Sequence, residues 1–77
     1  MTYKENLNWR LQGQRQLIYD LKRKLRFAET QLDKALVDGN RDLTKVWGAE
    51  CYRLENDIPF HEFELECLKN ELKELEQ

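Results

Sequence analysis

The sequence has few residues that interrupt regular structure. Only three glycines and one proline occur among 77 residues, and turns depend mainly on these two residue types. A chain of this length forms one domain at most and buries a thin core. Charged residues make up 36% and hydrophobic ones 40%, a balance typical of long solvated helices. We therefore expect few, long helical elements.

Long apolar runs are also missing. No stretch approaches the roughly 18 apolar residues that a membrane-spanning helix needs, and residues 1–6, MTYKEN, lack the apolar core of a secretion signal. We expect a cytoplasmic protein with no membrane contact. Cys51 and Cys67 would lie about 24 Å apart on a continuous helix, too far for a mutual disulfide. Both are expected as reduced thiols.

Hydrophobic residues recur at alternating steps of three and four in both halves of the chain. This spacing is the heptad pattern of helices that pair along one seam. Gln14 interrupts the first seam and His61 interrupts the second. The apolar seam positions are Leu7, Leu11, Ile18, Leu21, Leu25, Ala28, Leu32 and Ala35 in the first half, and Trp47, Cys51, Leu54, Ile58, Leu65, Leu68, Leu72 and Leu75 in the second.

A turn is predicted between the two seams, at residues 38–41. Gly39 or Asn40 can take the left-handed conformation that ends a helix, and Asn40 or Asp42 can cap the next one. Two chains running as uninterrupted antiparallel helices would form the same seam pairs. Gly39 at the centre of such a helix would be unfavourable by about 1 kcal/mol, which favours the hairpin over the swapped dimer.

The predicted fold is an all-α, antiparallel two-helix coiled-coil hairpin that forms a single domain over residues 1–77. Its helices are expected at about 4–37 and 42–76. Pro59 lacks an amide hydrogen and crowds the preceding turn, so the second helix is expected to be kinked there. A break at this point is not favoured because the heptad spacing continues through it.

The register of the hairpin follows from residue numbers, because facing seam positions sum to 79. Leu25 then faces Leu54, and Gln14 and His61 fall in adjacent layers, where a polar contact is expected to set the register. Charged flanks support this alignment with four facing pairs of opposite sign. These pairs are Lys22 with Glu55, Arg15 with Glu62, Lys24 with Asp57 and Arg10 with Glu71.

Apolar residues that lie off the seam are candidates for protein contacts. We single out Trp9, Tyr52, Phe60, Phe63 and Cys67, because exposed aromatic surface on a small protein usually marks an interface. Two hairpins could associate through them into a homodimeric four-helix bundle. Alternatively, the same residues could bind a different protein.

Catalysis and cofactor binding have little support. His61 is the only histidine, and a structural zinc site needs about four ligands at short spacings. Neither cysteine is spaced to pair with this histidine as a nucleophile, and no glycine-rich phosphate loop occurs. We expect a protein that is not an enzyme, with no catalytic residue, no metal, no cofactor and no small-molecule substrate.

A basic run, KRKLR at residues 22–26, raises the possibility of nucleic-acid binding. In the predicted register only Arg23 and Arg26 of this run are left without a facing acid. The chain has a net charge of −2, with eight basic and five acidic residues in 1–39 against five and ten in 40–77. These numbers do not favour a nucleic-acid partner, which stays a second alternative.

The function predicted from these surfaces is protein–protein interaction. The protein would act as a small adaptor or inhibitor that presents a helical face to a larger partner, and such a short reading frame would suit a phage or mobile element. The first alternative is a structural coiled-coil scaffold or assembly factor that acts by self-association.

Overall fold

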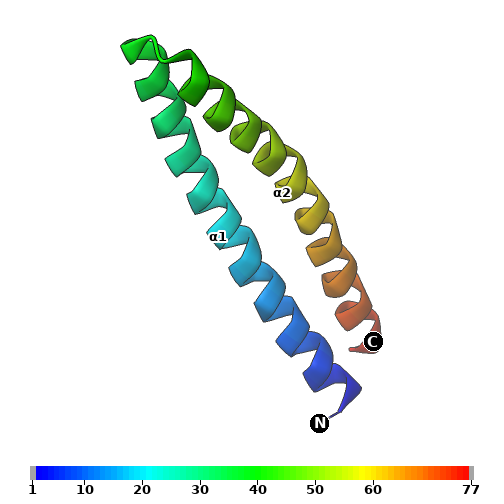
Figure 1. The fold of residues 1–77 in the computed structure, drawn as a ribbon. Coiled ribbons are helices and arrows are strands. Elements are labelled where there is room, and N and C mark those ends of the chain that lie inside the picture. Colours follow the sequence, from blue (N-terminus) through cyan, green and yellow to red (C-terminus); the bar gives the residue numbers. More distant parts are fainter. Residues whose placement is uncertain (1, 77) are drawn as a thin grey trace.

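Two long helices joined by a tight turn make up the protein, whose computed structural model describes residues 2–76 (Figure 1). Helix α1 spans Tyr3–Asp38 and helix α2 spans Arg41–Leu75. They lie side by side and antiparallel in a body of 57 × 17 × 13 Å, with both chain ends at the end opposite the turn. The all-α hairpin is thus confirmed. Neither helix is apolar over enough of its length to cross a membrane.

Gly39 and Asn40 determine the conformation of the turn. Gly39 has φ 69° and ψ 23°, a left-handed conformation that costs glycine little because it has no Cβ. Its amide donates to the carbonyl of Leu36, and the Asn40 amide donates to that of Ala35 at 2.9 Å. The Asn40 side chain then accepts from the amide of Leu43 at 3.1 Å and caps α2. The reversal therefore needs only two residues.

The two heptad seams face each other and form the core. Leu7 and Leu54 are fully buried, and the central cluster contains both members of four expected pairs. The cluster consists of Leu21, Ala28, Cys51, Leu54 and Ile58, with Leu25, Leu32 and Trp47 packed against it. Leu75 is the exception, at 47% exposed. The position that would face it is Lys4, which offers no apolar partner.

Helix α2 continues through Pro59 without a break. It curves along its length with its concave side toward α1 (Figure 1). Pro59 is exposed and has no N–H to donate to the carbonyl of Glu55, a loss that bends a helix away from the proline. Because Pro59 lies on the outer side, the bend keeps the two halves of α2 against α1.

The ion pairs differ from the four that the register predicted. Lys22 pairs with Glu62 at 3.5 Å, and at the open end Lys4 pairs with Glu76 at 3.6 Å. Asp57 pairs within its own helix, with Arg53 at 3.3 Å. Exposed pairs of this kind contribute about 0 to 1 kcal/mol, so long side chains choose among several nearby partners. Helix register alone does not decide which partner they take.

Candidate functional site

A polar layer interrupts the seam at Gln14 and His61. The Gln14 side-chain nitrogen lies 3.1 Å from His61 Nδ1, 3.1 Å from the His61 carbonyl oxygen and 3.2 Å from Glu64 Oε2. An amide NH₂ has two hydrogens, so it serves two of these three acceptors at a time. The residues that were expected in adjacent layers are therefore in direct contact. A slipped alignment would separate Gln14 from all three acceptors.

Replacing both Gln14 and His61 with leucine tests whether this layer sets the register. We expect the free energy of unfolding to rise by about 1 to 2 kcal/mol, because two more apolar side chains enter the seam. We also expect extra amide peaks in a ¹H–¹⁵N correlation spectrum, since a uniform seam permits slipped alignments. A single set of peaks in the double variant would show that the apolar seam specifies the register by itself.

The outer surface of α2, opposite the seam, carries a continuous uncharged stripe. Apart from the adjacent Pro59 and Phe60, its members recur at steps of three and four, so they share one helix face, and all of them are exposed. This outer stripe consists of Ala49, Tyr52, Asn56, Pro59, Phe60, Phe63, Cys67 and Asn70. Tyr52 is 71% exposed, Phe60 61% and Phe63 68%. Ala49, Asn56, Pro59 and Asn70 were not among the five sequence candidates, although the absence of charge at this spacing could have revealed them.

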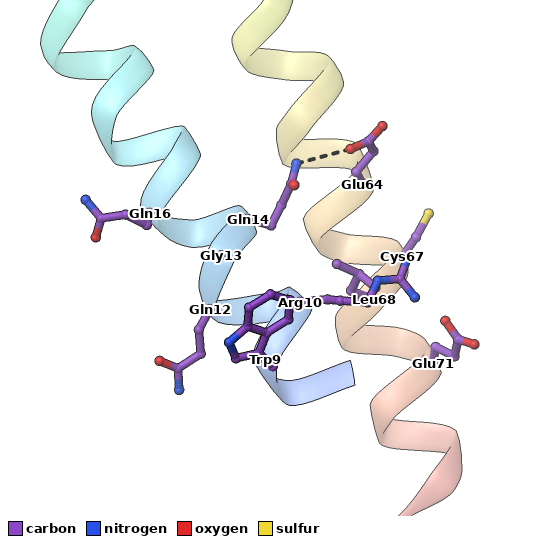
Figure 2. A pocket seen from close by; sticks show the side chains of 10 residues that line it. All are labelled: Trp9, Arg10, Gln12, Gly13, Gln14, Gln16, Glu64, Cys67, Leu68 and Glu71. Atoms are coloured by element: carbon purple, nitrogen blue, oxygen red, sulfur yellow. Dashed lines mark hydrogen bonds between the residues drawn. The ribbon is translucent and has the colours of Figure 1, made fainter. Parts of the chain in front are cut away.

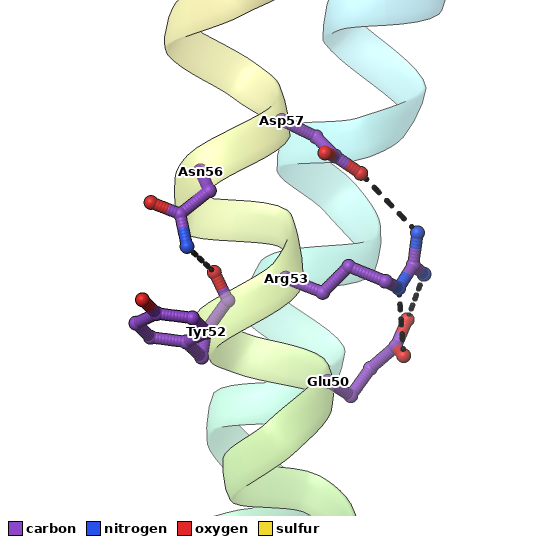
Figure 3. A network of polar contacts seen from close by, with 5 residues as sticks. All are labelled: Glu50, Tyr52, Arg53, Asn56 and Asp57. Atoms are coloured by element: carbon purple, nitrogen blue, oxygen red, sulfur yellow. Dashed lines mark hydrogen bonds and ion pairs between the residues drawn. The ribbon is translucent and has the colours of Figure 1, made fainter.

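Charged side chains lie along the edge of the outer stripe, where several of them pair with one another. Arg53 binds Glu50 and Asp57, the residues three before it and four after it. Figure 3 shows this cluster on one side of α2, with Tyr52 and Asn56 on the other. The Asn56 side chain donates to the Tyr52 carbonyl at 2.9 Å, which uses an amide donor without adding charge to the stripe.

Carboxylates line both edges of the outer stripe. We call Glu55, Glu64, Glu66 and Glu71 the acidic rim, since each lies three or four residues from an aromatic or cysteine member of the stripe. Glu64 accepts from Gln14 at 3.2 Å, Glu66 pairs with Lys69 at 3.6 Å, and Glu71 accepts from the Tyr3 hydroxyl. That hydrogen bond raises the pKa of Tyr3. The stripe is thus uncharged, and carboxylates border it on both edges.

Trp9 and Cys67 come together from different helices. Both line a groove between the helices (Figure 2). Arg10 extends from α1 toward Leu68 in this groove, whereas Gln12 and Gln16 point away from α2. Trp9 is 71% exposed. Of the five sequence candidates, Tyr52, Phe60, Phe63 and Cys67 therefore share the outer stripe, while Trp9 lies on α1 and shares only the groove with Cys67.

The two broad sides of the hairpin carry different sets of residues. On the side that carries the groove of Trp9, which we call the groove side, Gln16 donates a hydrogen bond to Asp20 at 3.1 Å, and Asp20 belongs to a second groove. This second groove is lined by Asp20, Arg23, Lys24, Phe27, Trp47 and Glu50, and Phe27 packs edge-on against Trp47 at 5.6 Å. The opposite side has a groove lined by Arg15, Ile18, Tyr19, Lys22, Glu62, Leu65, Glu66 and Lys69. The groove side therefore carries three aromatic residues, Trp9, Phe27 and Trp47, against one, Tyr19, on the opposite side.

The arginines considered for nucleic-acid binding lie on the exposed surface of α1. The Arg23 guanidinium lies 5.9 Å from the centre of the Tyr19 ring, a cation–π contact. Lys22 is held by Glu62 of α2. Arg23, Lys24 and Arg26 form the remaining cationic surface of the run, because Asp57, the expected partner of Lys24, pairs with Arg53.

The two thiols differ in environment. Cys51 is buried in the central cluster, and this burial, with nearby carboxylates such as Glu29, raises its pKa. Cys67 is exposed on the outer stripe. Because the thiolate is the reactive form, burial and a raised pKa both protect Cys51.

A thiol reagent such as 5,5′-dithiobis(2-nitrobenzoate) is expected to modify Cys67 within seconds and Cys51 only when the hairpin opens. The rate at Cys51 should rise with urea in parallel with the loss of helical circular dichroism. A Cys67→Ser variant isolates this slow phase. Fast modification of Cys51 in that variant without urea would contradict the buried position.

Residues 2–76 contain no cluster of three or more histidine, cysteine, aspartate or glutamate side chains that could hold a metal ion. Comparison with known proteins found no protein-family model, no curated protein and no solved structure that matches this chain. The surfaces described above are therefore what indicates a function.

Proposed function

We propose that this protein is a non-enzymatic binding module whose outer stripe receives one helix of another protein. The observation that carries the proposal is the absence of charge along an exposed helix face from Ala49 to Asn70. This length corresponds to about 30 Å at 1.5 Å per residue. A second helix with apolar residues at the same spacing could pack along it.

The centre of the stripe has the composition of a binding hot spot. Phe60, Phe63 and Cys67 are consecutive neighbours on one face, and the two aromatic rings expose most of their surface. Aromatic residues contribute most where neighbouring groups exclude water around them. The charged rim on both edges would complete such an arrangement, as polar rims do around other interfaces. Covering one helix of a larger protein would make this module an inhibitor or an adaptor.

The experiment compares the parent with a Phe60→Ser, Phe63→Ser double variant. A partner captured from cell extract is purified, and its dissociation constant is measured by titration calorimetry. Loss of two hot-spot rings is expected to weaken binding by at least about 100-fold. A Tyr19→Ser, Val37→Ser variant removes two exposed apolar residues from α1 instead and should bind like the parent. Equal affinity of the phenylalanine variant and the parent would refute the outer stripe as the binding face.

The groove side favours a second candidate function, self-assembly into a scaffold. Trp9 and Phe27 are exposed there, at 71% and 59%, and two hairpins packed on this side would form a four-helix bundle. This packing differs from the one expected from the sequence, in which Tyr52, Phe60, Phe63 and Cys67 also take part. Light scattering at several concentrations tests this candidate. A Trp9→Gln, Phe27→Gln variant should convert a dimer to a monomer, while the Phe60, Phe63 variant should not. A parent that is monomeric throughout would exclude the scaffold.

A further inference from the structure

We propose that the helix bound by the outer stripe is basic and amphipathic and belongs to a different protein. This inference rests on the proposed function and adds the chemistry of the partner. It depends on charge complementarity between the acidic rim and the flanks of the bound helix, which steers binding and selects partners.

The charge around the stripe is strongly negative. Helix α2 carries five basic and nine acidic side chains. Between residues 55 and 74 the imbalance is greater, with seven carboxylates and two lysines. This is the segment that contains Phe60, Phe63 and Cys67. A helix lying on these residues would place its own flanking side chains beside the carboxylates.

The acidic rim keeps acceptor capacity for such a helix. A carboxylate has two oxygens with about four acceptor sites, and the hydrogen bonds and ion pairs of Glu64, Glu66 and Glu71 use only part of them. The side chains of Glu64 and Glu66 are 44% and 65% exposed. Lysine or arginine on both edges of the bound helix could therefore pair with them, whereas acidic residues would be repelled.

A second copy of this chain does not fit the stripe well. Packing α2 on α2 would bring two acidic rims together, which is unfavourable. Helix α1 is basic and exposes Trp9, Tyr19, Phe27 and Val37, but these residues lie eight to ten positions apart and do not form a continuous apolar face. The outward positions between them include Gln12, Gln16, Arg23, Thr30 and Lys34, all of them exposed and polar. A basic helix with its own apolar face, from another protein, would supply both the positive charge for the acidic rim and the apolar surface for the stripe.

Two synthetic helical peptides of about 21 residues, long enough to cover the stripe, test the proposal. Both carry leucine at one heptad seam, and they differ only in flanks of lysine or of glutamate. The lysine peptide should bind the parent at least about 50-fold more tightly than the glutamate peptide in 0.05 M NaCl. High salt should reduce this preference, because the Debye length falls to about 3 Å at 1 M.

Substitutions in the acidic rim test whether its carboxylates cause the preference for the lysine peptide. Glu55→Gln with Glu66→Gln should weaken binding of the lysine peptide by about 5-fold to 20-fold, given the usual contribution of exposed pairs. Glu29→Gln with Asp33→Asn removes two exposed carboxylates from α1 and leaves net charge matched, so this control should stay within about 2-fold of the parent.

The outcomes separate the two proposals. Equal binding of both peptides, lost in the Phe60, Phe63 variant, would overturn the basic partner and leave the binding module standing. Lysine-peptide binding that is unchanged in the phenylalanine variant would overturn both proposals, because it would reflect nonspecific charge attraction. A parent that dimerises through the stripe and excludes both peptides would identify a second copy as the occupant and also overturn the inference.

Discussion

Leu54→Ala is expected to unfold most of the hairpin at 25 °C. Leu54 is fully buried at the centre of the core cluster, and replacing a buried leucine with alanine costs about 2 to 5 kcal/mol because a cavity remains. A chain of this size with one seam rarely has more than about 3 to 5 kcal/mol of stability to lose. Circular dichroism at 222 nm should therefore show a loss of more than half of the helical signal.

Leu36→Ala is the matched control for this prediction. It removes the same atoms from a leucine of α1 that is 58% exposed, and alanine is the better helix former. The helical signal should match that of the parent, and the free energy of unfolding from urea titration should stay within about 0.5 kcal/mol of it. A Leu54→Ala variant as stable as Leu36→Ala would show that the seam does not support the fold.

Replacing Gly39 and Asn40 with alanine is expected to convert the hairpin into a swapped antiparallel dimer. The left-handed Gly39 position is unfavourable for alanine by about 1 kcal/mol, and loss of the Asn40 cap costs about 1 kcal/mol more. Alanine also favours a continuous helix through the former turn by about 1 kcal/mol relative to glycine. Because facing residues sum to a constant, the same seam pairs re-form between two chains.

Light scattering measures this change as a doubling of mass that increases with protein concentration. Gly48→Ala is the control, since a Cβ at Gly48 would meet nothing within 4 Å and this glycine lies inside α2. That variant should keep the mass of the parent and gain about 1 kcal/mol of stability. Unchanged mass in the turn variant would mean that the turn survives without its glycine.

Local signals explain why most of the fold could be predicted from the sequence. The seam follows from spacing alone, and Gly39 and Asn40 mark the turn because few other residues take those conformations readily. The helices end within one residue of the predicted positions. The curvature at Pro59 follows from its missing amide hydrogen.

The side-chain partners were harder to predict, for physical reasons. Gln14 reaches His61 and Glu64 from one position, because long side chains span more than one layer of a seam. Lys22 pairs with Glu62 and not with its expected partner Glu55. Such choices depend on rotamers whose energies differ by less than about 1 kcal/mol, which residue spacing does not encode.

The turn at Gly39 also determines the order in which the chain gains structure. Seam partners close to it, such as Ala35 and Thr44, close a short loop, whereas Leu7 and Leu72 can meet only after most of the chain has come together. Loop-closure entropy increases with the number of residues enclosed, so we expect folding to start at the turn and the seam to pair progressively toward the chain ends. Opening runs in reverse, and the ends that Lys4 and Glu76 hold together separate first.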